Sequence, residues 1–290
     1  MGIRHDLQRS IFKVLKYNRD GSFATQDERK HILFKFAEDL VSLGFGLPNI
    51  NGLKEKHILA VVKHWRSKKL SNGTLKNRMA VLRHLATHIN KPNIVPTNDR
   101  LGIGKRSYIP KINRAIHHPD FSKITDKFIR ISLELQRVFG LRREEALKIR
   151  PFLADKENHL VLQPSWCKGG RGRAIPIRTE EQRYWLNRAK DLVKLENQSL
   201  IPCKKSYVKQ RALYDKQVNR AGLKNLHGLR HAYAQRRYKE LTGWDAPING
   251  GLKSRELTAE QKQIDYQARM VLTEELAHSR EQITVNYLGR

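Results

Sequence analysis

The end of the chain places a histidine and a tyrosine at a fixed distance from each other. His278 lies nine residues before Tyr287 in the segment AHSREQITVNY, and three residues follow the tyrosine. Three other short basic motifs precede this segment: GLRREEAL at 140–147, KGGRGRAIPI at 168–177 and HGLRH at 227–231. Each motif alone has an ordinary interpretation, such as a surface ion pair, a solvated turn or a helix cap. Only the four motifs in combination indicate chemistry.

Together the motifs contain the side-chain types that attack on a phosphodiester requires. Two guanidiniums can form forked hydrogen bonds to phosphate oxygens and stabilise the charge that concentrates there in the transition state. A tyrosine oxygen can attack phosphorus and form a covalent intermediate. The ordinary pKa of tyrosine is about 10, so cationic neighbours and a base must help it lose its proton. A lysine on a mobile turn can protonate the leaving sugar oxygen.

With these motifs, the second half of the chain resembles the tyrosine recombinase (phage integrase) family. In that family the order along the chain is Arg, Lys, His-x-x-Arg, His or Trp, and Tyr, and residues 120–290 show the same order. The resemblance implies a site-specific DNA recombinase that forms a 3′-phosphotyrosine and needs neither a cofactor nor a metal. It implies six catalytic residues and one acidic companion of the first arginine: Arg142, Lys168, His227, Arg230, His278 and Tyr287, supported by Glu145.

The resemblance also implies a separate role for each position. Arg142, Arg230 and His278 would hold the phosphate oxygens. His227 would assist deprotonation or orientation, and Lys168 would protonate the leaving 5′ oxygen. The motifs are most similar to those of proteobacterial prophage-type integrases, which implies integration or excision of a bacterial mobile element.

Three features depart from the family pattern. Arg230 and His278 are about twice as far apart as usual, so residues 242–263 are interpreted as an insertion, a loop followed by the start of a helix. Ala277 stands where the family usually has glycine before the histidine. A positive φ there would cost alanine about 1 kcal/mol, so we expect the local backbone to differ instead. Because so little follows Tyr287, we expect subunits to pack through another element, unless the chain is trimmed.

The charge of the chain indicates a polyanionic partner. Lys and Arg total 57 against 28 Asp and Glu, a formal net charge of +29, which favours nucleic acid first and an anionic membrane surface second. There is no apolar run of about 18 residues, no signal peptide, and Asp6 occupies the place where a myristoylation signal needs Ser or Thr. Cys167 and Cys203 lack metal-ligand spacing. We expect a bacterial cytoplasmic, nucleoid-associated protein that binds double-stranded DNA.

The elements of the first 90 residues are all predicted to be helices. The stretches 25–46, 53–70 and 73–89 each place apolar residues on one helical face. Thr25 and Glu28 have the spacing of a capping box at the start of the first stretch. Several basic residues lie off the apolar stripe of the third stretch, and two more follow the lysine of the glycine-rich turn. These residues either stay solvated or contact DNA phosphates. The residues expected to bind DNA are Lys76, Arg78, Arg83, Arg171 and Arg173.

The rest of the chain is predicted to be mixed in structure. Residues 91–118 are rich in Pro, Gly and Asn and are interpreted as a linker. Two helices broken at Gly140 follow, then short strands in 159–167 and 172–177, and helices to the end, one of them capped by Thr258. The predicted fold is mainly α. Residues 1–105 would form a helical core DNA-binding domain, and residues 119–290 a mixed α+β catalytic domain with a small antiparallel sheet.

The working assembly implied by the resemblance is a ring of four protomers on two DNA sites, with DNA-bending accessory factors as possible partners and no membrane. No arm-binding domain precedes the first helices, so we expect a single class of DNA site.

Other functions stay open. A metal-dependent nuclease could use His227 and His231, four residues apart, but no Glu stands between them and no third ligand is evident, and the 12 histidines show no other cluster. A DNA-binding relative without chemistry would explain the charge but not the order of the motifs. A type IB topoisomerase-like nicking-closing enzyme would use the same residues. Tyr266 is the alternative nucleophile.

Overall fold

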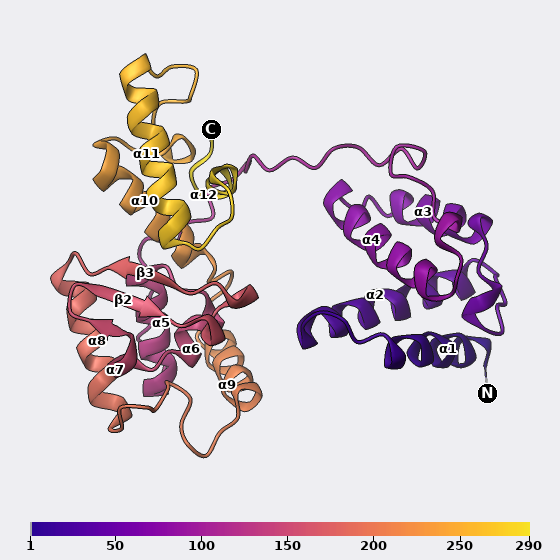
Figure 1. The fold of residues 1–290 in the computed structure, drawn as a ribbon, viewed down its shortest axis with the longest axis horizontal. Coiled ribbons are helices and arrows are strands. Elements are labelled where there is room, and N and C mark those ends of the chain that lie inside the picture. The colour runs from indigo at the N-terminus through magenta and orange to yellow at the C-terminus, as the bar shows by residue number, and fades with distance from the viewer. Residues whose placement is uncertain (1) are drawn as a thin grey trace. The chain divides into compact units, whose positions relative to one another are not determined.

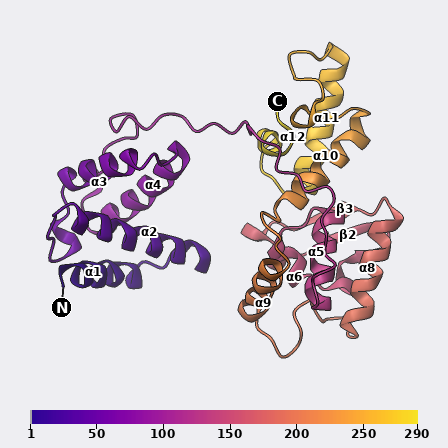
Figure 2. The same cartoon turned by 180° about the vertical axis from the view of Figure 1, so that it is seen from behind.

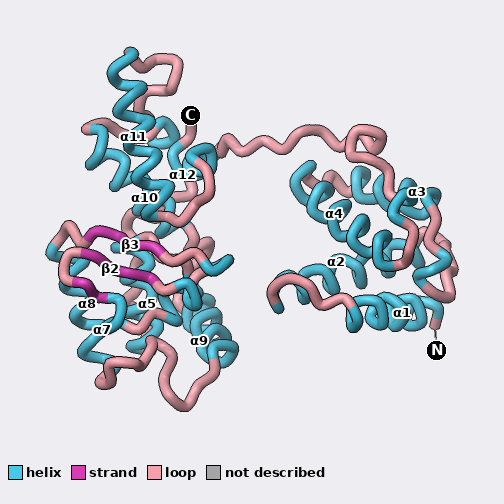
Figure 3. The backbone as a smooth tube through the Cα atoms, in the orientation of Figure 1, coloured by secondary structure: helices cyan, strands magenta, loops and turns pink. Residues whose placement is uncertain are grey.

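The structure is a computed structural model that describes residues 2–290 as two compact units, one ending at Ser107 and the other beginning at Tyr108 (Figure 1). Helices predominate in both units, and one small antiparallel sheet lies in the second (Figure 3). The predicted fold class is therefore confirmed. No helix among residues 2–290 is both long enough and apolar enough to cross a lipid bilayer.

Four helices build the first unit, as the sequence predicts for residues 1–90. They are α1 (Ile3–Tyr17), α2 (Phe23–Ser42), α3 (Glu55–Ser67) and α4 (Asn72–His88). Their apolar stripes pack into one core, in which the buried ring of Trp65 donates a hydrogen bond to Asp39 at 2.7 Å. The start of α2 differs from the prediction. Ser22 is the cap, and its hydroxyl accepts from the Thr25 backbone N–H, because an equally good capping side chain stands three residues earlier.

The expected linker is partly folded into the first unit. Val95, Leu101 and Ile103 belong to its buried core. The side chain of Arg83 on α4 donates to the backbone carbonyl of Pro96 at 2.7 Å and to the side chain of Asn98 at 3.0 Å. These contacts fasten residues 95–103 along α4, so a segment without helical periodicity still has fixed structure.

The second unit contains a three-stranded sheet, which lies between two groups of helices (Figures 1 and 2). Helices α5 (Lys127–Phe139), α6 (Arg143–Lys148) and α7 (Pro151–Ala154) lead into strands β1 (Asp155–Lys156), β2 (His159–Leu162) and β3 (Arg173–Pro176). The strands are antiparallel in the order β1-β2-β3, and Leu160 lies opposite Ile175. Then follow α8 (Glu180–Val193), α9 (Tyr207–Arg220), α10 (Gly228–Thr242), α11 (Ala259–Glu275) and α12 (Val285–Leu288).

The break between α5 and α6 depends on glycine. Gly140 ends α5 with a φ of +62°, and a Cβ atom added there would lie 2.5 Å from the ring of Tyr233 on α10. Only glycine satisfies both conditions. The predicted break at Gly140 is confirmed, and the close approach of Gly140 to Tyr233 packs the end of α5 against α10.

The segment 242–263 joins α10 to α11 as a loop with one short 3₁₀ turn, Pro247–Asn249, and then the beginning of α11. Thr258 caps α11 in a capping box with Gln261, as predicted. The loop is packed against the protein: Ala246 is buried, and the backbone of Gly289 lies close to Ile248. The insertion therefore supports the end of the chain that follows α12.

Candidate active site

The structure brings five of the six predicted catalytic residues together in the second unit. Arg142 is the residue before α6, His227 and Arg230 lie at the start of α10, His278 follows α11, and Tyr287 lies in α12. They come from four separate elements, which meet where α11 ends.

Two arginines converge on one backbone carbonyl. Arg142 Nη2 donates to the carbonyl oxygen of Leu276 at 3.2 Å, and Arg230 Nη2 donates to the same oxygen. Arg230 is buried, and its Nη1 donates to the carbonyl of Gly140 at 2.5 Å. Its Nε is buried without a hydrogen-bond partner among the described residues. Burial lowers the pKa of Arg230 to about 10, so the guanidinium stays charged at neutral pH. Two positive charges thus face one neutral carbonyl, an arrangement suited to an anion.

Glu145 is the buried carboxylate behind these arginines. It accepts from the backbone N–H of Arg142 at 2.7 Å and from Arg142 Nη1 at 2.7 Å. Arg173 donates to both of its oxygens, at 3.0 and 2.8 Å. Burial opposes ionisation of Glu145, but the hydrogen bonds and charges of Arg173, Arg230 and Arg142 outweigh it and lower the pKa to about 2. One carboxylate therefore balances three guanidiniums, and the cluster keeps an excess of positive charge.

The expected DNA contact of Arg173 does not fit its position. Only 4% of its side chain is exposed, and besides Glu145 it donates from Nε to the carbonyl of Glu275 at 2.6 Å. The reason is strand alternation: Arg173 and Ile175 point to the same face of β3, and Ile175 is fully buried. The period of two along the strand was the signal that could have placed Arg173 inside. The structure makes it a support for Glu145 and for the end of α11.

Tyr287 is surrounded by three histidine rings. It is 6% exposed, and its ring centroid lies 4.6 Å from that of His231, 5.4 Å from that of His278 and 6.1 Å from that of His227. Burial, followed by the nearby Arg230 charge, lowers the pKa of His278 to about 3 and also lowers the pKa of His227. Burial and the His227 ring lower the pKa of His231 to about 4. The three imidazoles are therefore neutral at pH 7, and His278 Nε2 is buried without a partner among the described residues.

Three further residues hold this arrangement. From the sequence only His231 is considered, as a ligand of a metal-dependent nuclease. His231 packs on Tyr287, as described above. Gln235 Nε2 donates to the backbone carbonyl of Tyr287 at 3.0 Å and to the side chain of Asn113 at 2.8 Å. Arg269 is buried and donates to the hydroxyl of Thr284 at 3.2 Å and to the carbonyl of Gly289 at 3.3 Å. The contacts fix α12 on both sides. No spacing rule points to Gln235 or Arg269, because their partners lie far away in the sequence.

The backbone before His278 does not differ from the glycine pattern, contrary to our expectation. Ala277 has a φ of +47°. Its N–H bonds to Glu274 O at 2.9 Å, and the N–H of His278 bonds to Thr273 O at 2.8 Å. This pair of bonds is the Schellman motif, which normally carries glycine at the Ala277 position. The left-handed turn directs the chain from α11 back toward Tyr287. Ala277 therefore adopts the strained positive φ, and the local backbone does not change to avoid it.

Lys168 lies on the turn between β2 and β3. It is exposed and forms no ion pair or hydrogen bond with the described residues. Gly169 and Gly170 follow it with φ values of +72° and +66°, and no atom lies within 4 Å of the place where a side chain would begin on either. The turn has open space around it and no contact that fixes the amine. Arg171 beside it is exposed.

The expected DNA-binding residues of the first unit have mixed environments. Lys76 is half-buried on α4. The guanidinium of Arg78 stacks on the ring of Trp65, 4.6 Å from its centroid, and Arg83 is bonded to the loop after α4. The guanidiniums of Arg78 and Arg83 therefore have structural contacts within the unit.

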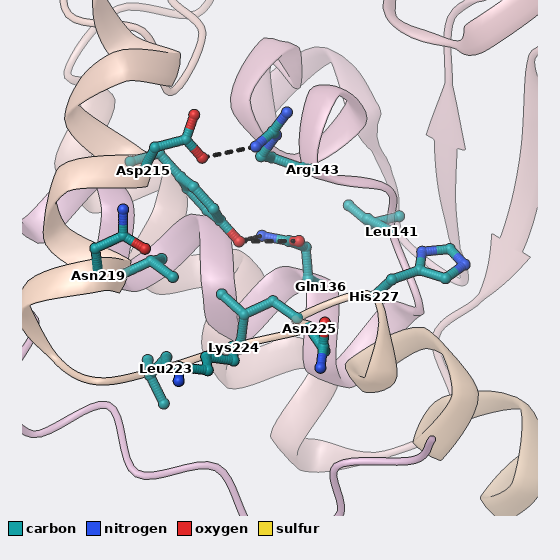
Figure 4. A pocket seen from close by; sticks show the side chains of 12 residues that line it. Gln136, Leu141, Arg143, Asp215, Asn219, Leu223, Lys224, Asn225 and His227 are labelled. Atoms are coloured by element: carbon teal, nitrogen blue, oxygen red, sulfur yellow. Dashed lines mark hydrogen bonds and ion pairs between the residues drawn. The ribbon is translucent and has the colours of Figure 1, made fainter. Parts of the chain in front are cut away.

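A cavity of about 580 Å³ lies on one side of His227 (Figure 4). Arg143, which is paired with Asp215 at 2.7 Å, and Lys224 line it, whereas Tyr287 and Arg230 do not. The cavity is thus a basic recess next to the histidine and is separate from the arginine pair.

Comparisons with known proteins give related results for both units. A family model described as "Phage integrase, N-terminal" matches residues 5–94, and one described as "Integrase" matches residues 110–236. No curated protein sequence matches the chain at a significant level.

Solved structures share the fold at low sequence identity. XerH site-specific recombinase bound to a palindromic difH substrate is 18% identical, with a TM-score of 0.58, over 97% of this chain and 80% of that one. A lambda integrase dimer bound to a COC′ core site is 14% identical, with a TM-score of 0.58, over 98% and 96%. The Tn1549 transposon integrase with circular intermediate DNA is 16% identical, with a TM-score of 0.53, over 100% and 96%.

Proposed function

The chain belongs to the phage integrase family of tyrosine recombinases and is a tyrosine site-specific recombinase, and we propose that Tyr287 is its nucleophile. The observation that carries this proposal is the convergence of Arg142 and Arg230 on one carbonyl oxygen, beside a buried tyrosine that neutral histidines surround. A scissile phosphate that reached this point would meet two forked donors and one oxygen nucleophile.

In the cleavage step, Tyr287 Oη attacks the phosphorus, its proton passes to neutral His227, and a 3′-phosphotyrosine forms. Arg142 and Arg230 bind the non-bridging oxygens, where negative charge accumulates. His278 donates an N–H to one of them, which gives a partner to the buried Nε2. The bond from phosphorus to the 5′ oxygen breaks at the same time.

The leaving 5′ oxygen takes its proton from Lys168. The lysine must move to the DNA for this, and its open turn without fixing contacts is compatible with such a movement. In the second step a 5′-hydroxyl of another strand attacks the phosphotyrosine, Lys168 takes up a proton, and Tyr287 regains its own. The covalent bond to tyrosine replaces the original phosphodiester, so the reaction needs neither ATP nor a metal.

The two units would share the DNA. We assign the first unit, 1–105 with the linker at about 91–118, to core-site binding and residues 119–290 to catalysis. The net charge of +29 supports contact with a duplex over both units. Lys76 and Arg171, together with the positive excess around Arg142, are the groups that we expect to contact phosphates.

The assembly would consist of four protomers on two duplex sites, since strand exchange requires two duplexes to be cut in a coordinated way. A lambda integrase tetramer has been solved on a Holliday junction, which supports this assembly. We further propose that the chain integrates or excises a mobile element of the proteobacterial prophage type, aided by DNA-bending factors. The long spacing between Arg230 and His278 supports this closer assignment.

The proposal can be tested with a supercoiled plasmid as substrate. The plasmid carries two direct repeats of one DNA sequence, the joined ends of the mobile element that encodes the chain. A recombinase resolves it into two smaller circles in the presence of EDTA. Relaxation without resolution would indicate a type IB topoisomerase-like enzyme, and DNA binding without any new product would indicate a non-catalytic relative. Linear product that disappears with EDTA would indicate a metal-dependent nuclease.

A further inference from the structure

We propose that the first unit contains a binding site for a divalent transition-metal ion of the Zn²⁺ class, formed by Asp20, His84 and His88. Asp20 lies in the connection between α1 and α2, and the two histidines lie one turn apart on α4. The expectation that the histidines show no further cluster was wrong: the i, i+4 spacing of His84 and His88 was visible, but Asp20 stands 64 residues away. This inference concerns the first unit and does not depend on the proposed function.

Two of the distances between the three ligand atoms are close to those around a tetrahedral ion. His84 Nε2 lies 3.0 Å from Asp20 Oδ1 and 3.2 Å from His88 Nε2. The three ligand atoms all lie within 4.8 Å of one another. Zinc binds nitrogen and oxygen at about 2.0–2.2 Å in tetrahedral sites, which places its ligand atoms about 3.3 Å apart. A single ion could bind all three groups and keep its fourth position for solvent.

The arrangement of protons favours an ion over hydrogen bonds alone. His84 Nε2 lies within hydrogen-bond distance of a carboxylate oxygen and of a second imidazole nitrogen. A single proton on this nitrogen would have to serve both contacts, and a proton donated from His88 Nε2 instead would leave the contact with Asp20 without one. A cation would satisfy the three lone pairs together.

Arg29 influences the affinity of the site for a metal ion. It donates to both oxygens of Asp20, at 2.7 and 3.0 Å, which orients the carboxylate as outer-shell partners do in metal sites, but its charge also competes with a cation. His84 Nδ1 is buried and has no partner among the described residues. Because such a partner is typically worth 10–100-fold in metal affinity, we expect a site weaker than a structural zinc finger. The bound ion would tie the α1–α2 connection to α4.

The test uses the full chain with Co²⁺ and Zn²⁺ alone. Co²⁺ should give the visible absorption of a four-coordinate ion, Zn²⁺ should displace it at one equivalent, and Zn²⁺ should raise the melting temperature. His88→Gln should weaken binding at least tenfold, and Asp20→Asn should do the same if the first variant fails to fold. His117→Gln, which changes one of two adjacent histidines in the second unit, is the matched control and should bind like wild type. Absorption, stoichiometry and affinity that are unchanged in both His88→Gln and Asp20→Asn would overturn the proposal.

Discussion

The residues around Arg142 and Arg230 carry more positive than negative charge. Arg142 and Arg173 donate hydrogen bonds to a single carboxylate, Glu145, and the charge of Arg230 also acts on it. Arg142 and Arg230 both donate to the carbonyl of Leu276. A carbonyl dipole compensates a charge less well than an anion does. In the free protein the guanidinium donors are therefore aligned, but part of their positive charge is not compensated. A phosphodiester would supply the missing negative charge.

The shape of the guanidinium matters more than its charge in this set. We expect Arg142→Lys and Arg230→Lys to fold normally and to lose roughly 10²–10³ in cleavage rate, because lysine keeps the charge but not the fork. Single-turnover cleavage of a nicked substrate, with circular dichroism as the control for folding, measures this. Near wild-type cleavage in either variant would remove that arginine from the site.

The proposed role of Lys168, on the β2–β3 turn, can be tested separately. A 5′-bridging sulfur leaves without a proton, so Lys168→Ala should cleave a normal substrate poorly and a 5′-bridging phosphorothioate substrate almost as fast as wild type. Arg142→Ala should show no such rescue, because the role proposed for Arg142 is to bind the non-bridging oxygens. Normal cleavage of both substrates by Lys168→Ala would make Lys168 a solvated turn residue and favour Arg171 as the backbone contact. An equal defect on both would make it a positioning residue.

At the scale of elements, the connection from α11 to α12 decides where His278 and Tyr287 lie. The Schellman turn at Ala277 reverses the chain, Arg269 holds the segment from α11, Gln235 holds it from α10, and the 242–263 loop packs against its end. The 242–263 loop is therefore part of the support of Tyr287.

The strain at Ala277 can be measured. Ala277→Gly should stabilise the protein by about 1 kcal/mol, because glycine adopts φ values near +47° without the Cβ penalty of alanine. Urea unfolding of the two proteins gives the difference. A control is Ala268→Gly within α11, which should destabilise, since a helical glycine costs about 1 kcal/mol. Destabilisation by Ala277→Gly would mean that the methyl group contributes more than the strain costs.

The elements that carry a clear period were predictable, and the contacts between distant elements were not. The break at Gly140, the two main strands and the Thr258 cap follow from local signals. Strand alternation predicts that Arg173 is buried, whereas the net charge of the chain favours a DNA contact for the same residue. The folding of residues 95–103 onto α4 and the bond from Gln235 to Tyr287 depend on tertiary packing, which no local pattern in the sequence records.

At the scale of the molecule, the buried neutral histidines make stability depend on pH. The pKa of His231 is lowered to about 4, so the unfolded chain binds a proton more readily than the folded one. The stability that this group contributes is complete above its ordinary pKa of about 6.5 and is lost as the pH falls toward 4. From pH 7 to pH 5 we expect a loss of about 2 kcal/mol from His231 alone.

His231→Gln should remove that part of the pH dependence. Urea unfolding at pH 7 and pH 5 should show a drop that is about 2 kcal/mol smaller in the variant than in the wild type. His159→Gln, at an exposed histidine of β2, should keep the wild-type drop. An equal drop in wild type and His231→Gln would mean that His231 titrates in the folded protein as it does in the unfolded chain.

The oxygen of Tyr287 should become covalently bound to DNA during cleavage, and a denaturing gel of labelled, nicked substrate detects this bond. Tyr287→Phe keeps the ring that packs among the histidines and should bind DNA without forming an adduct. Tyr266→Phe, at a tyrosine of α11 that is 51% exposed, should form the adduct as wild type does. A covalent band that persists in Tyr287→Phe and disappears in Tyr266→Phe would contradict the assignment of the nucleophile and, with it, the arrangement of the site around Tyr287.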